Sequence, residues 1–246
     1  MSQTEVSGST MAPRPQHSPR PNAFTLRLPV PSGLQVHEWR ARLQDYYDTD
    51  LYNFVEFGWP VSYTAATLPT STFKNHGSAL AEPDLIQSYL DKECSLGATC
   101  SPFSANPLCT ELTISPLYIA HSRSGKSRVV IDLSFPFSFS VNDGIPKDSY
   151  LNEPLTIRLP GTDTLVKIIL PKGPGYLFKK DLSHAYRQLR IDPRDFNLLS
   201  VQHHNYMYFD MTPPCGLRST AKMCQQTTSA VSHVSEAWLS LHELYR

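Results

Sequence analysis

The hydrophobic period of the chain changes near residue 116, and this change restricts the possible folds more than any other feature. Before it, apolar residues recur every three or four positions in stretches that proline and glycine interrupt. After it, apolar residues alternate with polar ones or run together in short segments, as strands require. The sequence therefore predicts an α+β chain, with helices before residue 116 and strands mainly after it.

Three helices are predicted in the first part of the chain. The first begins near Ser32, which suits a cap, and the second covers residues 51–57. The third lies within residues 81–93, where Pro83 fits the first turn of a helix. Residues 94–116 contain several prolines and are predicted to form a loop.

Two hairpins are predicted after residue 116. Residues 116–120 and 127–134 are apolar runs on either side of a polar turn. Residues 197–202 and 206–211 have the same pattern around "HHN". Apolar runs joined by a short polar turn are typical of antiparallel strand pairs.

The remaining segments predict one strand, one helix and one ambiguous element. Residues 176–181, "YLFKKD", follow a glycine-proline turn and are predicted to form a strand. Residues 165–170, "LVKIIL", fit either a helix or a strand. Residues 219–242 have apolar residues at helical spacing and predict one long helix.

Composition and charge give weaker information. Residues 1–25 are rich in Ser, Pro, Thr and Arg and are predicted to be a disordered tail. The chain carries 22 basic and 22 acidic residues, but residues 119–195 hold 12 basic and 8 acidic ones. This excess fits either a surface that faces phosphates or ordinary uneven charge.

The sequence also indicates a compartment. The five cysteines include no CxxC pair, so reduced and mostly buried thiols are expected. No apolar run approaches the roughly 18 residues of a membrane helix, and no apolar signal core follows the N-terminus. We expect an intracellular protein, cytoplasmic or nuclear, without a membrane partner.

Asp181 is the acid with the most suggestive position. It ends the predicted strand at residues 176–181, a place where α/β sheets often hold their chemistry. With Lys and Arg nearby, it could hold a divalent ion against a triphosphate. The alternative is an exposed acid paired with Lys180.

Three later motifs together resemble the fingers and palm of a reverse transcriptase. Residues 125–145, "GKSRVVIDLSFPFSFSVNDGI", resemble the fingers motif in which an Arg precedes an apolar strand. Residues 178–195, "FKKDLSHAYRQLRIDPRD", resemble motif A, and residues 208–226, "YFDMTPPCGLRSTAKMCQQ", resemble motif B. All three occur in the family's order and spacing.

The preceding residues are similar to DIRS-type, tyrosine-recombinase-encoding retrotransposons. The similarity lies in "NHGSAL" (75–80), "YLDKECSLGA" (89–98), "SPF" (101–103) and "ISPLYIA" (114–120). The resemblance implies a partial right-hand polymerase fold. Residues 26–115 would be a helical, element-specific N-terminal region, and residues 116–246 an incomplete fingers and palm.

The resemblance also implies roles for individual residues around Mg²⁺. Asp181 would be the first metal-binding, catalytic aspartate, and the carbonyl of Leu182 would help to hold the second ion. Tyr186 would lie under the sugar of the incoming dNTP and exclude a 2′-hydroxyl.

Two further segments would contact the nucleotide. Arg128 would bind the triphosphate with help from Lys126, although Arg128 could also be a surface cation at a strand end. Gly216 would allow the backbone to approach the nucleotide or template closely. The implied partners are an RNA template and a DNA primer, with the missing palm segment or other retroelement proteins as further candidates.

The sequence departs from the family at its catalytic acids. Reverse transcriptases carry a Tyr-x-Asp-Asp turn after motif B, whereas this sequence has no adjacent Asp pair. Two metal ions about 3.5–4 Å apart need several carboxylates. We therefore expect a truncated reverse transcriptase domain that is inactive in isolation. The alternatives are a non-catalytic nucleic-acid-binding relic and a transcribed relic without a role.

Overall fold

A computed structural model describes residues 27–69, 73–100, 102–108, 110–157, 161–172 and 182–244. The helices are α1 (Val36–Arg42), α2 (Leu51–Phe57), α3 (Gly77–Ala81), α4 (Pro83–Ser95), α5 (Thr162–Ile169) and α6 (Thr220–Leu244). The strands are β1 (Leu117–His121), β2 (Ser127–Ile131), β3 (Ser149–Tyr150), β4 (Glu153–Pro154), β5 (Ser200–His203) and β6 (Tyr206–Phe209). Four 3₁₀ turns are η1 (Asn142–Gly144), η2 (Leu170–Lys172), η3 (Ala185–Gln188) and η4 (Pro193–Leu198). The predicted tail and the predicted strand at 176–181 lie outside the described residues.

The predicted N-terminal helices are confirmed as α1, α2 and α4, with one wrong cap. Helix α1 begins at Val36, because the Ser32 hydroxyl instead accepts a hydrogen bond from the Leu34 amide at 3.1 Å. Pro83 occupies the first turn of α4, as predicted. The short helix α3 was not predicted.

The strands form separate antiparallel pairs among the described residues. Strands β1 and β2 pair with Ala120 opposite Arg128, and strands β5 and β6 form the second predicted hairpin. Strand β5 begins only at Ser200, because residues 193–198 form the 3₁₀ turn η4. The third pair, β3 with β4, is short. Residues 165–170 belong mainly to helix α5, which resolves that ambiguity.

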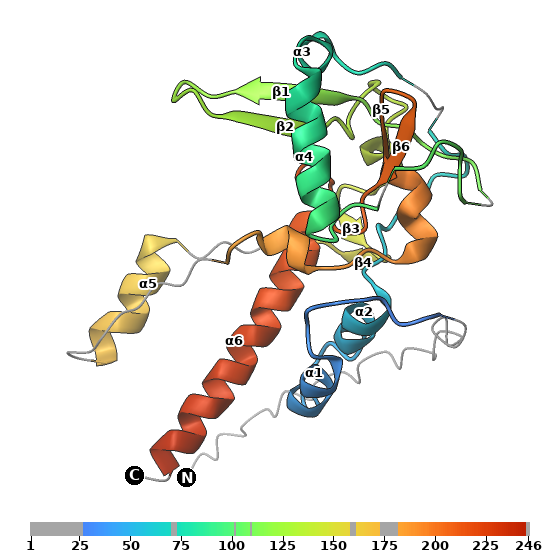
Figure 1. Cartoon of the computed structure of the whole chain (residues 1–246). Coiled ribbons are helices and arrows are strands. Elements are labelled where there is room, and N and C mark those ends of the chain that lie inside the picture. The colour runs from blue at the N-terminus through green and yellow to red at the C-terminus, as the bar shows by residue number, and fades with distance from the viewer. Residues whose placement is uncertain are drawn as a thin grey trace, which may run out of the picture.

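One hydrophobic core joins the N-terminal helices to the strand-containing region. Its fully buried side chains come from both parts of the chain and include Trp59, Ile86, Leu117, Ile191 and Met223. In Figure 1, helix α4 crosses the β1–β2 hairpin, and the β5–β6 hairpin lies to the right of the helix. The N-terminal helices therefore contribute to the same core as the later strands.

A backbone bridge fixes the contact between the two parts of the chain. The Trp59 amide donates to the Arg190 carbonyl at 2.7 Å, and the Asp192 amide donates to the Trp59 carbonyl at 3.0 Å. Gly58 precedes this bridge with a φ of +90°, and a Cβ there would lie 2.5 Å from the Ile191 carbonyl oxygen. Only glycine fits, because a side chain would clash with rigid backbone.

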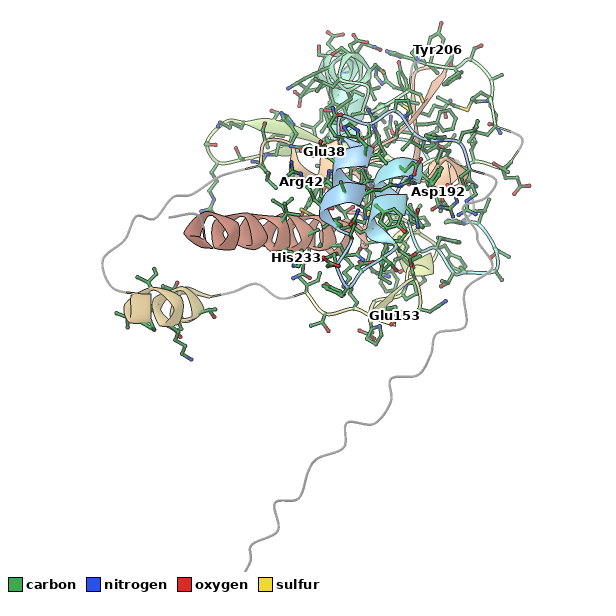
Figure 2. All side chains as sticks on the ribbon, turned by 90° about the horizontal axis from the view of Figure 1, so that it is seen from below. Glu38, Arg42, Glu153, Asp192, Tyr206 and His233 are labelled. Carbon is green, nitrogen blue, oxygen red and sulfur yellow. The ribbon has the colours of Figure 1, made fainter. Side chains whose placement is uncertain are left out.

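Helix α6 contributes Met223 and Ala230 to this core and then extends beyond it. Figure 1 shows α6 starting beneath the strands and projecting away from them, while α5 stands apart from the rest of the fold. Figure 2 gives the same arrangement from below, with Asp192 in the main body of the fold and Tyr206 at its edge. Among the described helices, none is both long and apolar enough to cross a membrane.

Candidate functional site

A cleft of about 430 Å³ lies where helix α4, strand β2, turn η3 and residues 213–215 meet. One wall is strand β2, and another is the segment that precedes Gly216. The polar side chains in its lining are Tyr89, Glu93, Arg128, His184, Tyr186 and Arg187. The cleft therefore combines residues that lie far apart in the sequence.

Arg128 comes from strand β2 and lies on the exposed side of the cleft. The hairpin turn before it is closed by the Ser122 amide, which donates to the Lys126 carbonyl at 2.8 Å, and by the Ser122 hydroxyl, which accepts from the Lys126 amide at 3.0 Å. Lys126 is exposed at this turn and does not line the cleft. An exposed guanidinium in this position can bind a phosphate with two parallel hydrogen bonds.

Tyr186 lies in turn η3, which follows a left-handed residue. His184 has a φ of 51°, and the Arg187 amide donates to its carbonyl at 2.8 Å. Burial raises the pKa of Tyr186, and the nearby Cys224 and Cys215 thiols raise it further. The phenol is therefore neutral at physiological pH, and its half-buried ring offers an apolar face to a sugar or a base.

The turn around Gly216 is held to the loop that follows strand β2. The side-chain amide of Asn142 donates to the Gly216 carbonyl at 2.8 Å, and the backbone amide of Arg218 donates to the side-chain oxygen of Asn142 at 2.9 Å. Gly216 has a φ of +97°, which favours glycine, and a Cβ there would meet nothing within 4 Å. The open space beside Gly216 leaves room for a ligand to approach the backbone.

The structure brings together only some of the predicted site residues. Arg128 and Tyr186 line one cleft, and Cys215, which also lines it, is the neighbour of Gly216. Leu182 is 52% exposed and does not line the cleft. Asp181 lies outside the described residues.

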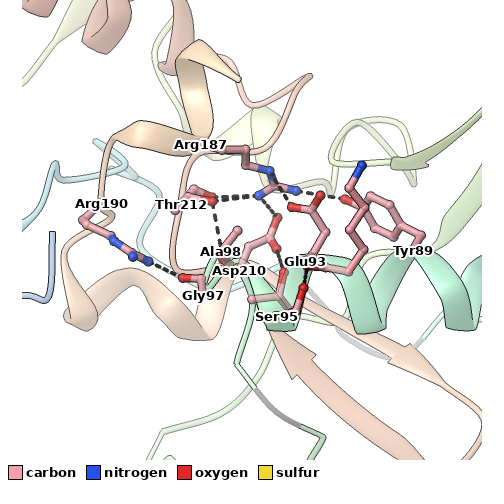
Figure 3. Close-up of polar contacts among 11 residues, drawn as sticks. Tyr89, Glu93, Ser95, Gly97, Ala98, Arg187, Arg190, Asp210 and Thr212 are labelled. Carbon is pink, nitrogen blue, oxygen red and sulfur yellow. Dashed lines mark hydrogen bonds and ion pairs between the residues drawn. The ribbon is translucent and has the colours of Figure 1, made fainter. Parts of the chain in front are cut away.

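Sequence reasoning missed an ionic network in the wall of the cleft. Figure 3 shows this network. The Arg187 guanidinium donates to Asp210 at 2.8 Å, contacts Glu93 at 3.1 Å and donates to the Tyr89 hydroxyl at 2.8 Å. It also donates to the Thr212 hydroxyl at 2.9 Å. The remaining oxygen of Asp210 accepts a hydrogen bond from Thr99 at 2.6 Å.

The network keeps Arg187 charged although it is largely buried. Desolvation would lower the Arg187 pKa, but the charges of Asp210 and Glu93 and the Tyr89 oxygen raise it above its ordinary value. One signal in the sequence could have revealed this network. Asp210 follows the apolar run "YMYF", and an acid that follows a buried strand needs a buried partner.

The metal-binding types of side chain are not clustered among the described residues. Within the described ranges, no group of three or more His, Cys, Asp or Glu side chains could hold a metal ion. Glu93 and Asp210, the acids beside the cleft, already contact Arg187. The expected metal ligand, Asp181, falls outside the described part of the chain.

The four described cysteines are less buried than the sequence led us to expect. Cys94, Cys100, Cys215 and Cys224 are free, none is fully buried, and Cys215 is exposed in the cleft lining. Cys215 is exposed because it lies in the turn before Gly216 and not on a strand that faces the core.

The fold and the cleft together define an α+β protein with an open, partly aromatic cleft that one exposed arginine borders. No protein-family model matches the sequence, and no curated protein matches it. Similar solved structures are those of the protease-reverse transcriptase of prototype foamy virus. The native form has a TM-score of 0.44 and 14% identity, covering 83% of this chain and 27% of that one.

Two further structures, one of the prototype foamy virus protein and one of a foamy viral protease-reverse transcriptase, give similar values. The CSH mutant has a TM-score of 0.42 and 17% identity, covering 79% of this chain and 26% of that one. The complex of the foamy viral enzyme with an RNA/DNA hybrid has a TM-score of 0.44 and 14% identity, covering 82% and 28%. The chain thus spans about a quarter of the length of these proteins.

Proposed function

We propose that the cleft is the nucleotide-binding end of a reverse-transcriptase-like module from a DIRS-type retrotransposon. Arg128 binds the triphosphate of a dNTP, and Tyr186 packs against its sugar. The turn at Gly216 borders the nucleotide or the template strand. The partners of the module are an RNA template and a DNA primer.

The observation that carries this proposal is the convergence of three sequence motifs on one cleft. Arg128, Tyr186 and Cys215 come from the separate segments 125–145, 178–195 and 208–226, and all three line the same space. A cation and an apolar ring in one cleft suit a phosphate-bearing sugar.

Binding without nucleotidyl transfer is the activity that the 246 residues support. Their sequence has no adjacent Asp pair, and the two acids beside the cleft are bound to Arg187. Asp181 alone cannot hold two metal ions against a triphosphate. The second candidate function is non-catalytic binding of nucleic acid. It is favoured because Glu93 and Asp210 contact Arg187 and so are not available as metal ligands.

The proposal can be tested with a fluorescent RNA–DNA primer–template. Wild-type protein should bind it with an affinity that falls as salt rises, because phosphate contacts release counterions. The next complementary dNTP should strengthen the complex. Arg128→Ala should weaken that dNTP effect by about tenfold or more, since hydrogen bonds to charged groups contribute about 1.5–3 kcal/mol.

The matched control is Arg123→Ala, which removes an exposed arginine from the hairpin turn outside the cleft. Equal effects of the two substitutions would show only general charge attraction and would contradict the proposed site. Incorporation of labelled dNTP on the primed RNA should be absent for the wild-type chain. Incorporation that disappears in Asp181→Ala would instead establish a polymerase.

A further inference from the structure

We infer that Arg187 is a positioning residue that fixes the Tyr186 ring in the cleft by tying turn η3 to helix α4. The inference rests on the proposed function, because it assigns Arg187 a part in selecting the sugar that Tyr186 contacts. It also makes the N-terminal region a component of the nucleotide cleft.

The backbone of turn η3 is too short to hold Tyr186 by itself. The turn covers four residues and follows the left-handed His184. Its closing bonds are those from the Arg187 amide to the His184 carbonyl at 2.8 Å and from the Leu189 amide to the Tyr186 carbonyl at 3.2 Å. A single 3₁₀ turn has weak hydrogen-bond geometry and needs tertiary contacts to stay in place.

Arg187 supplies those contacts from the position next to Tyr186. Its guanidinium reaches two separate elements, which Figure 3 shows on either side of it. On one side lie Asp210 and Thr212, after strand β6, at 2.8 and 2.9 Å. On the other side lie Glu93 and Tyr89, on helix α4, at 3.1 and 2.8 Å.

The fixed fork geometry of a guanidinium makes this arrangement specific. Arg187 contacts four side chains at once, and its own side chain is only 17% exposed. A lysine could keep the charge but not the set of directed hydrogen bonds. Movement of Arg187 would break several buried contacts together, so Tyr186 is held within a narrow range of positions.

Helix α4 shares in the cleft through the same network. Tyr89 and Glu93 both contact Arg187 and both line the cleft. Burial raises the pKa of the Tyr89 hydroxyl, and the Asp210 charge raises it further, so it remains a neutral partner. The N-terminal region therefore forms part of the wall and also anchors the turn that carries Tyr186.

The test uses the full chain labelled with fluorotyrosine. The Tyr186 ¹⁹F resonance is assigned by its loss in Tyr186→Phe, since the chain has 12 tyrosines. Arg187→Met and the milder Arg187→Lys and Glu93→Gln should shift or broaden this resonance. The milder variants keep the measurement possible if Arg187→Met, which leaves two buried carboxylates without their partner, does not fold.

The matched control is Arg190→Met. Arg190 lies three residues further along and contacts the turn just after helix α4, through the Gly97 carbonyl. It does not contact Glu93 or Asp210 in the described network, and it does not line the cleft. Its removal should leave the Tyr186 resonance unchanged.

The second measurement compares the binding of a dNTP and the matching NTP to the primer–template complex. Arg187→Lys should reduce the preference for dNTP over NTP by about tenfold, because a Tyr186 ring that moves away from the sugar excludes the 2′-hydroxyl less strictly. Effects of this size are expected when a positioned group moves by about 1 Å. Arg190→Met should keep the wild-type preference. A purely structural role would lower the affinity for both nucleotides equally.

The outcomes separate the two proposals. An unchanged Tyr186 resonance in folded Arg187→Lys and Glu93→Gln, or a change equal to that of Arg190→Met, would overturn the positioning role. Wild-type protein that binds no nucleotide would overturn the proposed function, while the resonance would still decide the role of Arg187. A shifted resonance with an unchanged sugar preference would limit Arg187 to structure and would also contradict the inference.

Discussion

Asp195 is a largely buried carboxylate that joins turn η4 to the N-terminal region. Its side chain accepts a hydrogen bond from the Val61 amide at 2.7 Å. Desolvation raises the Asp195 pKa from 3.8 to about 6, and the Asp192 charge adds to this effect. The Val61 hydrogen bond opposes the shift without cancelling it. Folding therefore favours the protonated acid.

The raised pKa of Asp195 predicts a loss of stability as pH rises. Because the pKa is higher in the folded state, the contribution of this group is fully present below pH 3.8 and is lost through about pH 6. Asp195→Asn stays neutral and can still accept the Val61 hydrogen bond. The unfolding free energy of Asp195→Asn should therefore exceed that of the wild type by an amount that grows from pH 4 to pH 7 and reaches about 1–3 kcal/mol.

Urea denaturation at several pH values measures this difference. Asp163→Asn, which changes an exposed acid on helix α5, is the control and should follow the wild-type curve. Parallel pH curves for Asp195→Asn and the wild type would contradict the prediction.

Single residues also show what sequence reasoning can reach in the candidate site. Arg128 and Tyr186 were predicted because each belongs to a local motif, and the structure places both in one cleft. Lys126 and Leu182 belong to the same motifs but lie outside that cleft. Arg187 was missed because its partners, Glu93 and Asp210, are distant in sequence and give it no local pattern.

At the scale of elements, Asn142 connects the loop after strand β2 to the turn at Gly216. It donates to Ser134 at 2.9 Å and to the Gly216 carbonyl at 2.8 Å, and it accepts from the Arg218 amide at 2.9 Å. The Arg218 guanidinium in turn contacts the Asn142 and Ile145 carbonyls. The loop after strand β2 and the turn at Gly216 are thus held as one unit.

Asn142→Ala should destabilise the fold by about 2–3 kcal/mol, because it leaves the Gly216 carbonyl and the Arg218 amide without these partners. Urea denaturation gives the loss, and hydrogen exchange of the Arg218 amide should become faster. Asn106→Ala is the control, since Asn106 makes two similar hydrogen bonds within an exposed loop, to Thr110 and from Leu108. Equal losses for the two variants would show that Asn142 has no special connecting role.

The elements differ in how well the sequence predicted them. Helices α2 and α4 and both predicted hairpins had strong local patterns and clear breakers, and the structure confirms them. The first predicted strand of the second hairpin was too long. Asp192 accepts a hydrogen bond from the Arg194 amide and Pro193 follows it, so residues 193–198 form a 3₁₀ turn instead. Capping chemistry therefore prevailed over the apolar pattern of Leu198 and Leu199.

At the scale of the whole molecule, the core depends on both halves of the chain. Trp59 and Ile86 pack in one cluster with Leu117 and Ile191, and all four are fully buried. Period and turn patterns predicted the order of helices and strands but not this shared core. Contacts between residues so far apart leave no trace in a local pattern.

A fragment of residues 116–246 should therefore fail to fold by itself. Removing the preceding residues exposes Leu117 and Ile191 and deletes the Glu93 and Tyr89 partners of Arg187. Urea denaturation followed by circular dichroism should show a cooperative transition for the full chain and none for the fragment. A fragment that unfolds cooperatively with dispersed amide resonances would contradict this expectation.

The ionic network around Arg187 also limits how this protein can be recombined with another chain. A chimera that takes helix α4 from another chain would need an acid at position 93, or the Arg187 guanidinium would lose one of its two carboxylate partners. The same holds for a graft that replaces the segment carrying Asp210. Positions 93, 187 and 210 should therefore be exchanged together, and crossover points that separate them should give hybrids that misassemble.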